Sequence, residues 1–403
     1  MKINRAYRYE LRPNIEQRIL LAKHAGCARF AYNWGLDQRI KQYEKDKTST
    51  NAIAQHRALN SLKQTEFHWM YEVSKCAPQE ALRDLDTAFK NFFRALKQGE
   101  NTGFPQFKKK DDRASFRLTG TIHIQERGVQ LPRLGFIRTK ETPAVQGRIL
   151  SVTCSREADR WFVSVCVEEE IEEPKQIQGE PIAIDLGLTT FATLSTEEKI
   201  QAPKPLKKHE RKLKRLQKQH SRKVKGSQNS KKSKLKIARK HRRIRNIRKD
   251  FLHQFSTKLA KATPVVVMED LNTKGMMQNR KLSKSIADVG WGELYTLLEY
   301  KTKWYGSKLV LAPRYFASSK TCHICGYKHD EMSLSIREWS CPECATEQDR
   351  DINAAKCLLR WYSTESSSGI YACGDTSNGT AELAVSYVSK KQELMSGIFV
   401  HKL

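Results

Sequence analysis

The sequence predicts a multidomain protein of mixed α and β structure, with its parts in the order β, α, β and α/β. Two observations support this order. The chain has 403 residues, which is too many for one small hydrophobic core, so two to four domains are expected. Along the chain, apolar residues recur first at every second position, as in strands, then at every third or fourth, as in helices, and then again at every second. In the last part of the chain, segments of both kinds alternate.

The first predicted strand covers residues 3–11, where apolar and polar residues alternate, and Pro13 ends it. Asn14 is a suitable N-cap, and helical spacing then continues to about residue 98. The clearest helix begins at Pro78, and its apolar face is formed by Leu82, Leu85, Ala88, Phe89, Phe92 and Phe93. A strand followed by a helical region is therefore expected.

The region from about residue 114 to 167 is rich in Val, Ile and aromatic residues and predicts β structure. The acidic run 168–174, which ends in Pro174, predicts an exposed linker and a domain boundary near residue 180. Beyond Tyr362 the chain becomes small and polar, which predicts a mobile C-terminal tail over 366–403.

The net charge indicates the partner. The chain has 73 Lys and Arg against 44 Asp and Glu, a formal charge of +29. Because such a surplus attracts polyanions, nucleic acid is the expected partner, and a basic surface that serves only solubility is the alternative. Charge alone does not distinguish DNA from RNA.

Much of this charge lies between Lys204 and Lys249, where 22 residues are Lys or Arg and Glu210 is the only acid. Spaced Leu and Ile residues form two helical stripes on either side of an interruption at 226–233. This pattern predicts a basic helical hairpin. A disordered basic tract is the alternative, although such tracts rarely carry spaced Leu and Ile.

The sequence also bears on the compartment. No apolar run approaches the roughly 18 residues that a membrane span needs. The first residues lack the continuous apolar stretch of a secretory signal, so a reducing cytoplasm is expected. The ten cysteines are then expected to be thiols or metal ligands.

Three acidic residues lie where a sheet could bring them together. Asp185 lies within the apolar run 181–188, and Glu269 ends the β-branched run 264–270. Asp351 stands at the start of an amphipathic helix. Because ligands of α/β sheets bind at the carboxyl ends of strands, these acids can converge on divalent cations. Two such ions about 4 Å apart would support phosphodiester hydrolysis.

Each acid alone would suit a turn or a helix cap, so their joint order carries the argument. The order Asp, Glu, Asp on strand, strand and helix differs from the Asp, Asp, Glu order expected of cut-and-paste transposases. A transposase with a ribonuclease H-like sheet remains the lesser interpretation.

Two C-x-x-C pairs, separated by 15 residues, have the spacing of a four-cysteine zinc site. Their members are Cys322, Cys325, Cys341 and Cys344. Four thiolates would close the tetrahedron, so this zinc is expected to be structural. Disulfide pairing is the alternative. His323 and His329 are not expected to be ligands.

Together these motifs resemble the TnpB family of transposon-encoded RNA-guided nucleases, which is related to type V CRISPR effectors. In chain order, the resemblance is carried by YRYELRPN, ARFAYNWGL, LDTAFKNFFRALK, GFPQFKKK, AIDLGL, VVMEDL, the two C-x-x-C pairs and QDRDINAAK. It covers about 360 residues and leaves out the tail.

The resemblance implies a multidomain α+β architecture. A wedge β-barrel would form from residues 1–12 and 111–180, with a helical recognition domain inserted at 13–110. A ribonuclease H-like (RuvC) α/β domain would cover 181–315 and 348–365. The zinc ribbon would be inserted into this domain at 316–347.

The resemblance further implies a magnesium-dependent, RNA-guided DNA endonuclease of an insertion sequence. Asp185, Glu269 and Asp351 match the three RuvC acids and would bind two Mg²⁺ ions, whereas Asp349 of the same motif is not expected to hold metal. The partners would be a guide RNA from the transposon end and target double-stranded DNA. The complex would be monomeric in protein and located in a prokaryotic cytoplasm or nucleoid.

The family also places readers of a short transposon-adjacent motif at Lys75 and Gln79, with Thr119 beside them. Lys and Gln can bond to base edges. Pro78 departs from the family pattern between the first two and affects their shared geometry.

Two alternatives remain open. The first is a nuclease-inactive RNA-guided DNA-binding repressor, although all three metal-binding acids are present. The second is a guide-free zinc-ribbon DNA-binding factor, which would leave the carboxylates unexplained.

Overall fold

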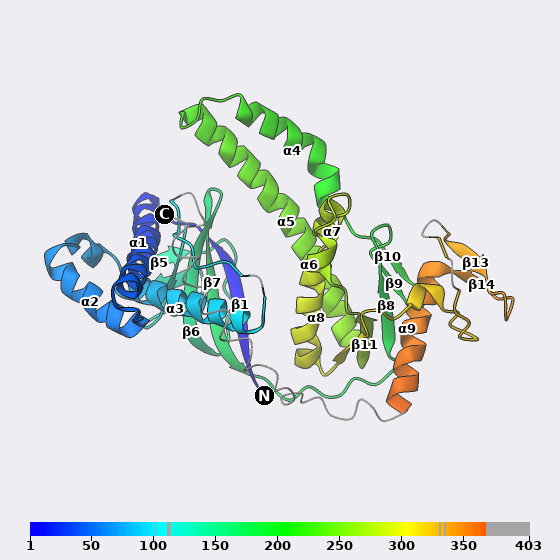
Figure 1. Cartoon of the computed structure of the whole chain (residues 1–403). Helices are drawn as coiled ribbons and strands as arrows, with labels where there is room; N and C mark the ends of the chain where they lie inside the picture. The colour runs from blue at the N-terminus through cyan, green and yellow to red at the C-terminus, as the bar shows by residue number, and fades with distance from the viewer. Residues whose placement is uncertain (101, 111–113, 330–331, 334–335, 368–403) are drawn as a thin grey trace. The chain divides into compact units, whose positions relative to one another are not determined.

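The structure is a computed structural model that describes residues 1–100, 102–110, 114–329, 332–333 and 336–367 (Figure 1). The chain divides into two compact units. The first consists of Met1–Gln178, Ala202–Ala262 and Thr273–Ser307, and the second of Gly179–Gln201, Thr263–Asn272 and the chain from Lys308 onward. None of the described helices is long and apolar enough to cross a membrane.

The first unit contains an antiparallel four-stranded sheet in the order β1-β7-β6-β2. Its strands are β1 (Lys2–Leu11), β2 (Ser115–Leu118), β6 (Arg148–Glu157) and β7 (Arg160–Glu170). A second sheet has the order β3-β4-β5, with strands His123–Gln125, Gly128–Leu131 and Gly135–Arg138. The predicted first strand is confirmed, because β1 buries Ile3 and Leu11 and leaves alternate residues exposed.

The predicted linker at 168–174 is wrong in its first half, because β7 continues to Glu170. Glu169 is 5% exposed, accepts a hydrogen bond from the Tyr7 hydroxyl at 2.6 Å and pairs with Arg5 at 2.9 Å. A buried carboxylate is tolerated when it is paired in this way. An acidic run therefore contains one residue that belongs to the core, and the irregular segment that follows covers 171–181.

Three α-helices and a 3₁₀ helix follow β1: α1 (Ile15–Asp46), α2 (Ala52–Thr65), η1 (His68–Glu72) and α3 (Cys76–Lys97). Asn14 caps α1 as predicted, and Gln17 completes a capping box. α3 begins two residues before Pro78, which therefore lies in the first turn, where no intrahelical N–H donor is needed. Only the first half of its predicted apolar face is buried, and Phe93 is 49% exposed.

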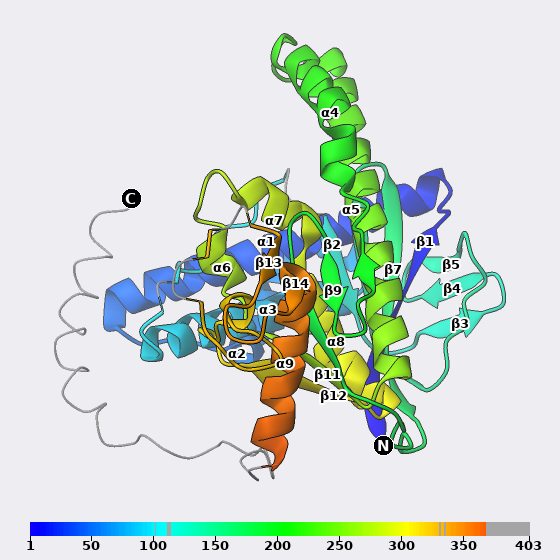
Figure 2. The same ribbon diagram turned by 90° about the vertical axis from the view of Figure 1, so that its right-hand side faces the viewer.

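The predicted basic hairpin is confirmed. α4 (Pro205–Ser221) and α5 (Gln228–Ala262) pack against each other, as both ribbon views show (Figures 1 and 2). Their connection covers 222–227, earlier than the predicted interruption. α5 also continues past Lys249, because Leu252, Phe255 and Leu259 are buried where it packs on α8 (Trp291–Tyr305). Two short helices, α6 (Thr273–Met276) and α7 (Ser283–Val289), precede α8.

The second unit is built on a five-stranded sheet in the order β10-β9-β8-β11-β12. The strands are β8 (Ile182–Leu186), β9 (Ala192–Leu194), β10 (Lys199–Ile200), β11 (Val265–Glu269) and β12 (Lys308–Ala312). β8, β11 and β12 are parallel, and β9 and β10 complete an antiparallel meander. The turn after β8 needs Gly187, because a Cβ there would lie 2.6 Å from the carbonyl oxygen of Thr190.

α9 (Arg350–Ser367) packs against β8, β9 and β11 of this sheet. Before it come η2 (Ser318–Lys320) and the short hairpin β13 (Glu338–Ser340) and β14 (Glu347–Asp349). The shared core contains Ala183, Val267, Val310, Ala312 and Leu358. α9 continues to Ser367, two residues into the predicted tail at 366–403, and the rest of that tail lies outside the described residues.

Candidate functional site

Asp185 and Glu269 lie on adjacent parallel strands. The register pairs Met268 with Ile184, so the next residue on each strand brings Glu269 beside Asp185. Neighbouring strands lie about 4.8 Å apart, and paired residues point to the same face. Glu269 is the last residue of β11, as the apolar run before it predicts. The sheet thus places two carboxylates at the carboxyl ends of its central strands.

Asp351 approaches this pair from the first turn of α9. Its neighbour Asp349 has a different role, because one carboxylate oxygen of Asp349 accepts the backbone N–H groups of Asp351 and Ile352, both at 3.0 Å. The other oxygen of Asp349 pairs with Lys199 at 2.6 Å. Asp349 therefore caps the helix that presents Asp351.

The electrostatics of Asp185 show that the three acids are neighbours. Burial, followed by the charges of Glu269 and Asp351, raises the pKa of Asp185 to about 8. Arg350 and Arg337 act in the opposite direction but do not compensate. A half-buried carboxyl flanked by two like charges takes up a proton unless a cation neutralises the group. The donor set therefore fits hard divalent cations such as Mg²⁺, which prefer carboxylate oxygen.

The carboxylate oxygens are not packed as closely as the ligands of a single ion. Among the described residues, the only group of three or more potential ligands whose atoms lie within 4.8 Å of one another is the cysteine group. Two of the acids are instead held by neighbours: the Ser318 hydroxyl donates to Glu269 at 2.5 Å, and Arg337 donates to Asp351 at 3.2 Å. These contacts fix the directions of both side chains.

Sequence reasoning missed Ser318, Arg337 and the ion pair of Arg314 with Asp270 at 2.6 Å. The topology of the sheet could have indicated two of these residues, Arg314 and Ser318. β12 runs parallel to β11, so the loop that follows it must leave the sheet at the same edge as Glu269, and its polar residues could have been expected there. No sequence signal indicates Arg337.

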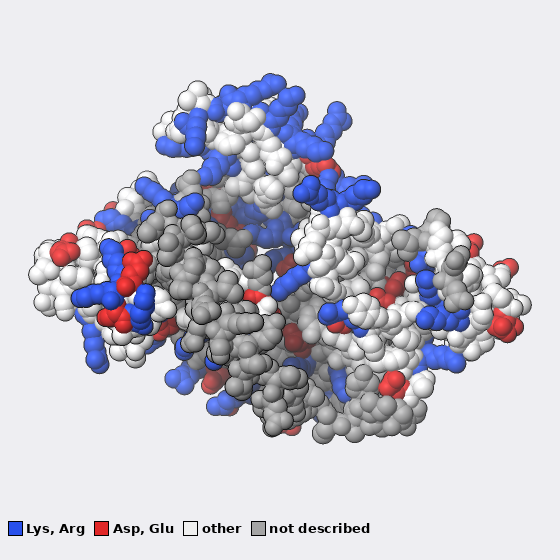
Figure 3. Space-filling model, in the orientation of Figure 1, with Lys and Arg blue, Asp and Glu red and all other residues white. Residues whose placement is uncertain are grey.

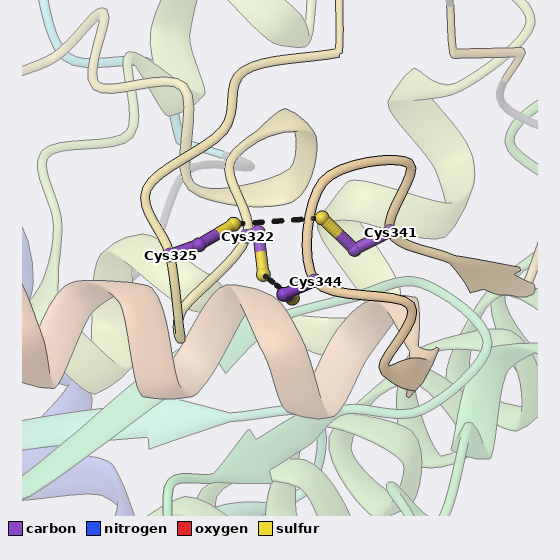
Figure 4. A group of neighbouring side chains, drawn as sticks. All are labelled: Cys322, Cys325, Cys341 and Cys344. Carbon is purple, nitrogen blue, oxygen red and sulfur yellow. Dashed lines mark hydrogen bonds between the residues drawn. The ribbon is translucent and has the colours of Figure 1, made fainter.

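The four predicted zinc ligands come together before α9 (Figure 4). Cys322 and Cys325 follow η2, and Cys341 and Cys344 lie between β13 and β14. The sulfurs of Cys322 and Cys344 are 3.7 Å apart, and those of Cys325 and Cys341 are 3.5 Å apart. Zn–S bonds of 2.3 Å in a tetrahedron require sulfur–sulfur distances of about 3.8 Å, whereas a disulfide requires about 2.05 Å. The geometry fits zinc, and among the described cysteines no disulfide forms.

Neighbouring groups also orient these ligands. Burial alone would raise the pKa of the Cys322 thiol, but backbone N–H donors of the knuckle and the Gln348 amide lower it to about 6. The Gln348 amide lies 2.8 Å from the Cys322 sulfur. The Nδ1 atom of His323 lies 3.0 Å from the Asn353 side-chain oxygen, and His323 is not a member of the four-cysteine ligand group. Such outer contacts tune metal ligands.

Two of the predicted motif readers lie at the start of α3. Lys75 is the exposed N-cap and Gln79 lies in the first turns, half-buried. The Cys76 thiol donates to the carbonyl oxygen of Thr119 at 3.3 Å, which brings the third residue beside the helix. The structure therefore brings all three to one region of the first unit, and Pro78 does not disrupt it.

Lys and Arg side chains gather over the α4–α5 hairpin (Figure 3). Three of the arginines on α5 are already paired with the turn between β6 and β7. Arg239 pairs with Asp159 at 2.8 Å, Arg242 donates to the carbonyl oxygen of Glu157 at 2.9 Å, and Arg245 pairs with the Glu157 carboxylate. Because they are three residues apart, they share one face of the helix.

Family comparisons agree with this picture. Residues 164–280 match the OrfB_IS605 model, described as "Probable transposase". Residues 291–358 match a "Cas12f1-like, TNB domain", and residues 1–48 match the helix-turn-helix domain of OrfB_IS605.

Two relatives match over nearly the whole chain. A "Putative RNA-guided DNA endonuclease" of Streptomyces pristinaespiralis is 37% identical, over 93% of this chain and 92% of that protein. InsQ of Escherichia coli K12, which carries the same description, is 31% identical over 93% and 95%. The chain therefore belongs to the TnpB (OrfB_IS605) family.

A solved structure shares the fold. The protein in a Cas12f1–sgRNA–target DNA complex superimposes with a TM-score of 0.55 at 13% identity, covering 89% of this chain and 99% of that one.

Proposed function

We propose that this chain is an RNA-guided DNA endonuclease of an insertion sequence, which cleaves target DNA next to a short transposon-adjacent motif. Membership of the TnpB family and the names of the two relatives support this proposal. The observation that carries it is the meeting of Asp185, Glu269 and Asp351 at one edge of the sheet.

In this proposal, Asp185, Glu269 and Asp351 hold two Mg²⁺ ions, which when bound would activate water and stabilise the leaving oxygen. The chain's own residues prepare the site. Burial and the neighbouring acids favour the protonated form of Asp185 in the metal-free protein. Asp185 would lose this proton when it binds metal, because only the carboxylate form is a good ligand. Ser318 donates a hydrogen bond to Glu269 and Arg337 donates one to Asp351, which would restrict the movement of these two acids.

The finer architecture is part of the same proposal. The five-stranded sheet with α9 corresponds to a ribonuclease H-like (RuvC) domain, and the four-cysteine hairpin to a zinc ribbon that binds one structural ion. The sheets of the first unit correspond to the wedge barrel. The pairing of β1 with β7, with helices α1 to α3 between β1 and β2 in sequence, supports an inserted helical recognition domain.

The basic hairpin would hold nucleic-acid backbones, a sequence-independent role with strong salt dependence. Guide RNA would pair with the target strand, and Lys75, Gln79 and Thr119 would read the adjacent motif. We expect one protein chain for each RNA.

The test starts with protein purified from cells that carry its own locus. RNA that copurifies is sequenced, and the complex is incubated with matched double-stranded DNA and Mg²⁺. We expect cleavage beside the adjacent motif. Asp185→Ala should abolish cleavage and leave RNA binding intact, whereas Asp250→Ala, which removes an exposed acid of α5, should cleave normally.

The alternatives predict other results. Binding of matched DNA without cutting by the unaltered protein would indicate a repressor. Absence of bound RNA would indicate a guide-free DNA-binding factor.

A further inference from the structure

The loop that leaves β12 carries an unusually exposed aromatic ring. Tyr315, three residues beyond the strand, is 93% exposed, more than any other large hydrophobic side chain among the described residues. Tyrosine usually buries its ring and keeps only the hydroxyl in water. Full exposure therefore requires an explanation.

The residues on both sides of Tyr315 make contacts through their side chains. Arg314 pairs with Asp270 at 2.6 Å on one side. On the other, the Phe316 ring packs 6.1 Å from that of Trp361 and joins the core between sheet and α9. Tyr315 is thus held outward between two anchored neighbours.

A third anchor connects this loop to the carboxylates. Ser318, three residues after Tyr315, is 2% exposed and donates to Glu269 at 2.5 Å. Asp270, which holds Arg314, is the residue next to Glu269. The exposed ring therefore projects from a loop whose ends are both tied to the strand that supplies a metal-binding acid.

The chemistry of this arrangement fits one kind of ligand. A flat, fully exposed ring matches a nucleobase, because bases stack on aromatic faces. A base inside a duplex is stacked on both faces, whereas an unpaired base offers a free face to this ring.

We infer that Tyr315 is a positioning residue, which stacks on an unpaired base of the DNA strand whose phosphate enters the carboxylate site. This inference rests on the proposed function. The ring would set the register of the strand, while Asp185, Glu269 and Asp351 act on the phosphodiester.

The first test measures cleavage. With the RNA complex in excess over matched DNA, Tyr315→Ala should slow single-turnover cleavage by about 5-fold to 150-fold, the range expected for loss of one stacked base. Tyr315→Phe keeps the ring and should restore most of the rate. Tyr43→Ala, which removes a partly exposed ring of α1, should cleave at the wild-type rate.

The second test does not depend on cleavage. Single-stranded DNA containing the fluorescent base 2-aminopurine is titrated with the full chain carrying Asp185→Ala, at high salt to weaken phosphate contacts. Stacking should quench the fluorescence. The quench should disappear when Tyr315→Ala is added and remain with Tyr315→Phe. Thermal unfolding should show that each variant folds.

The outcomes separate the two proposals. Unchanged cleavage and quenching in Tyr315→Ala overturn the inference and leave the nuclease proposal standing, as does equal loss in Tyr315→Ala and Tyr315→Phe. Ring-dependent quenching by a protein that never cuts would support the stacking role and reject the nuclease. If Tyr315→Ala changed binding to another protein and left binding to DNA unchanged, the stacking inference would also be overturned.

Discussion

The surroundings of Asp185 disfavour its charged form. Burial and the neighbouring Glu269 and Asp351 raise its pKa to about 8, whereas an Asp of the unfolded chain titrates near 3.9. Between these values the folded state binds more protons than the unfolded state. The free energy of unfolding of the metal-free protein therefore falls as the pH rises through this window.

We therefore expect Asp185→Asn to stabilise the protein in EDTA. The gain should be small near pH 4, grow towards pH 8 and then level off. Its size should be about 2–4 kcal/mol, below the full shift because solvent reaches this residue. Thermal melts across pH measure it. A gain that does not vary with pH would show that the three acids are not electrostatic neighbours. Mg²⁺ should stabilise the wild type and not the variant.

At the scale of elements, α5 shows how a basic helix can serve two purposes. The arginines at 239, 242 and 245 face the β6–β7 turn, where they pair with Asp159 and Glu157. Glu157 also pairs with Arg8 of β1 at 2.7 Å. This acidic turn holds the hairpin against the four-stranded sheet of the same unit and leaves the other faces of the helices basic.

Reversing one charge in this turn tests the role. Asp159→Lys would place three cations together, so we expect the unfolding temperature to fall by a few degrees, in line with losses of about 1 kcal/mol for partly exposed pairs. Hydrogen exchange should increase near residue 239 of α5. Asp250→Lys reverses an exposed charge of the same helix and should change neither quantity. Equal effects of the two variants would argue against the turn as an anchor.

At the scale of the whole chain, the net charge of +29 is divided between folding and binding. Exposed cations of the hairpin that face solvent can release counterions from nucleic acid, whereas cations paired with acids of the protein contribute less. The charge total alone therefore overestimates the number of phosphate contacts.

This division predicts different salt dependence. Replacing Lys212, Lys218, Arg222 and Lys225 by Gln removes four exposed cations, and should lower the slope of log K against log salt by up to about 3 for single-stranded nucleic acid. Replacing Arg239 and Arg245, which are paired with acids, should change the slope, per cation replaced, by less than half as much as replacing the four exposed cations. Binding titrations from low to high salt measure both. Equal slopes per cation would contradict the division.

Most elements were predictable because periodicity is local. The strand at 3–11, the hairpin of α4 and α5, and the runs ending in Glu269 needed only the spacing of apolar residues. The ends of elements were predicted less accurately where packing determines them. α5, for example, continues beyond its predicted end because its apolar residues pack against α8. The acidic run around Glu169 misled for the same reason.

The sequence by itself determined the main strands and helices, the candidate metal ligands and the family to which the chain belongs. Only the tertiary structure decided which residues face them: Arg337 beside Asp351, the acidic turn beside three arginines of α5, and an outward Tyr315. The reason is physical. An apolar pattern reports that one face of an element is buried, but the partner of a charge depends on what folding brings across from it, and distant positions carry no local record of that contact.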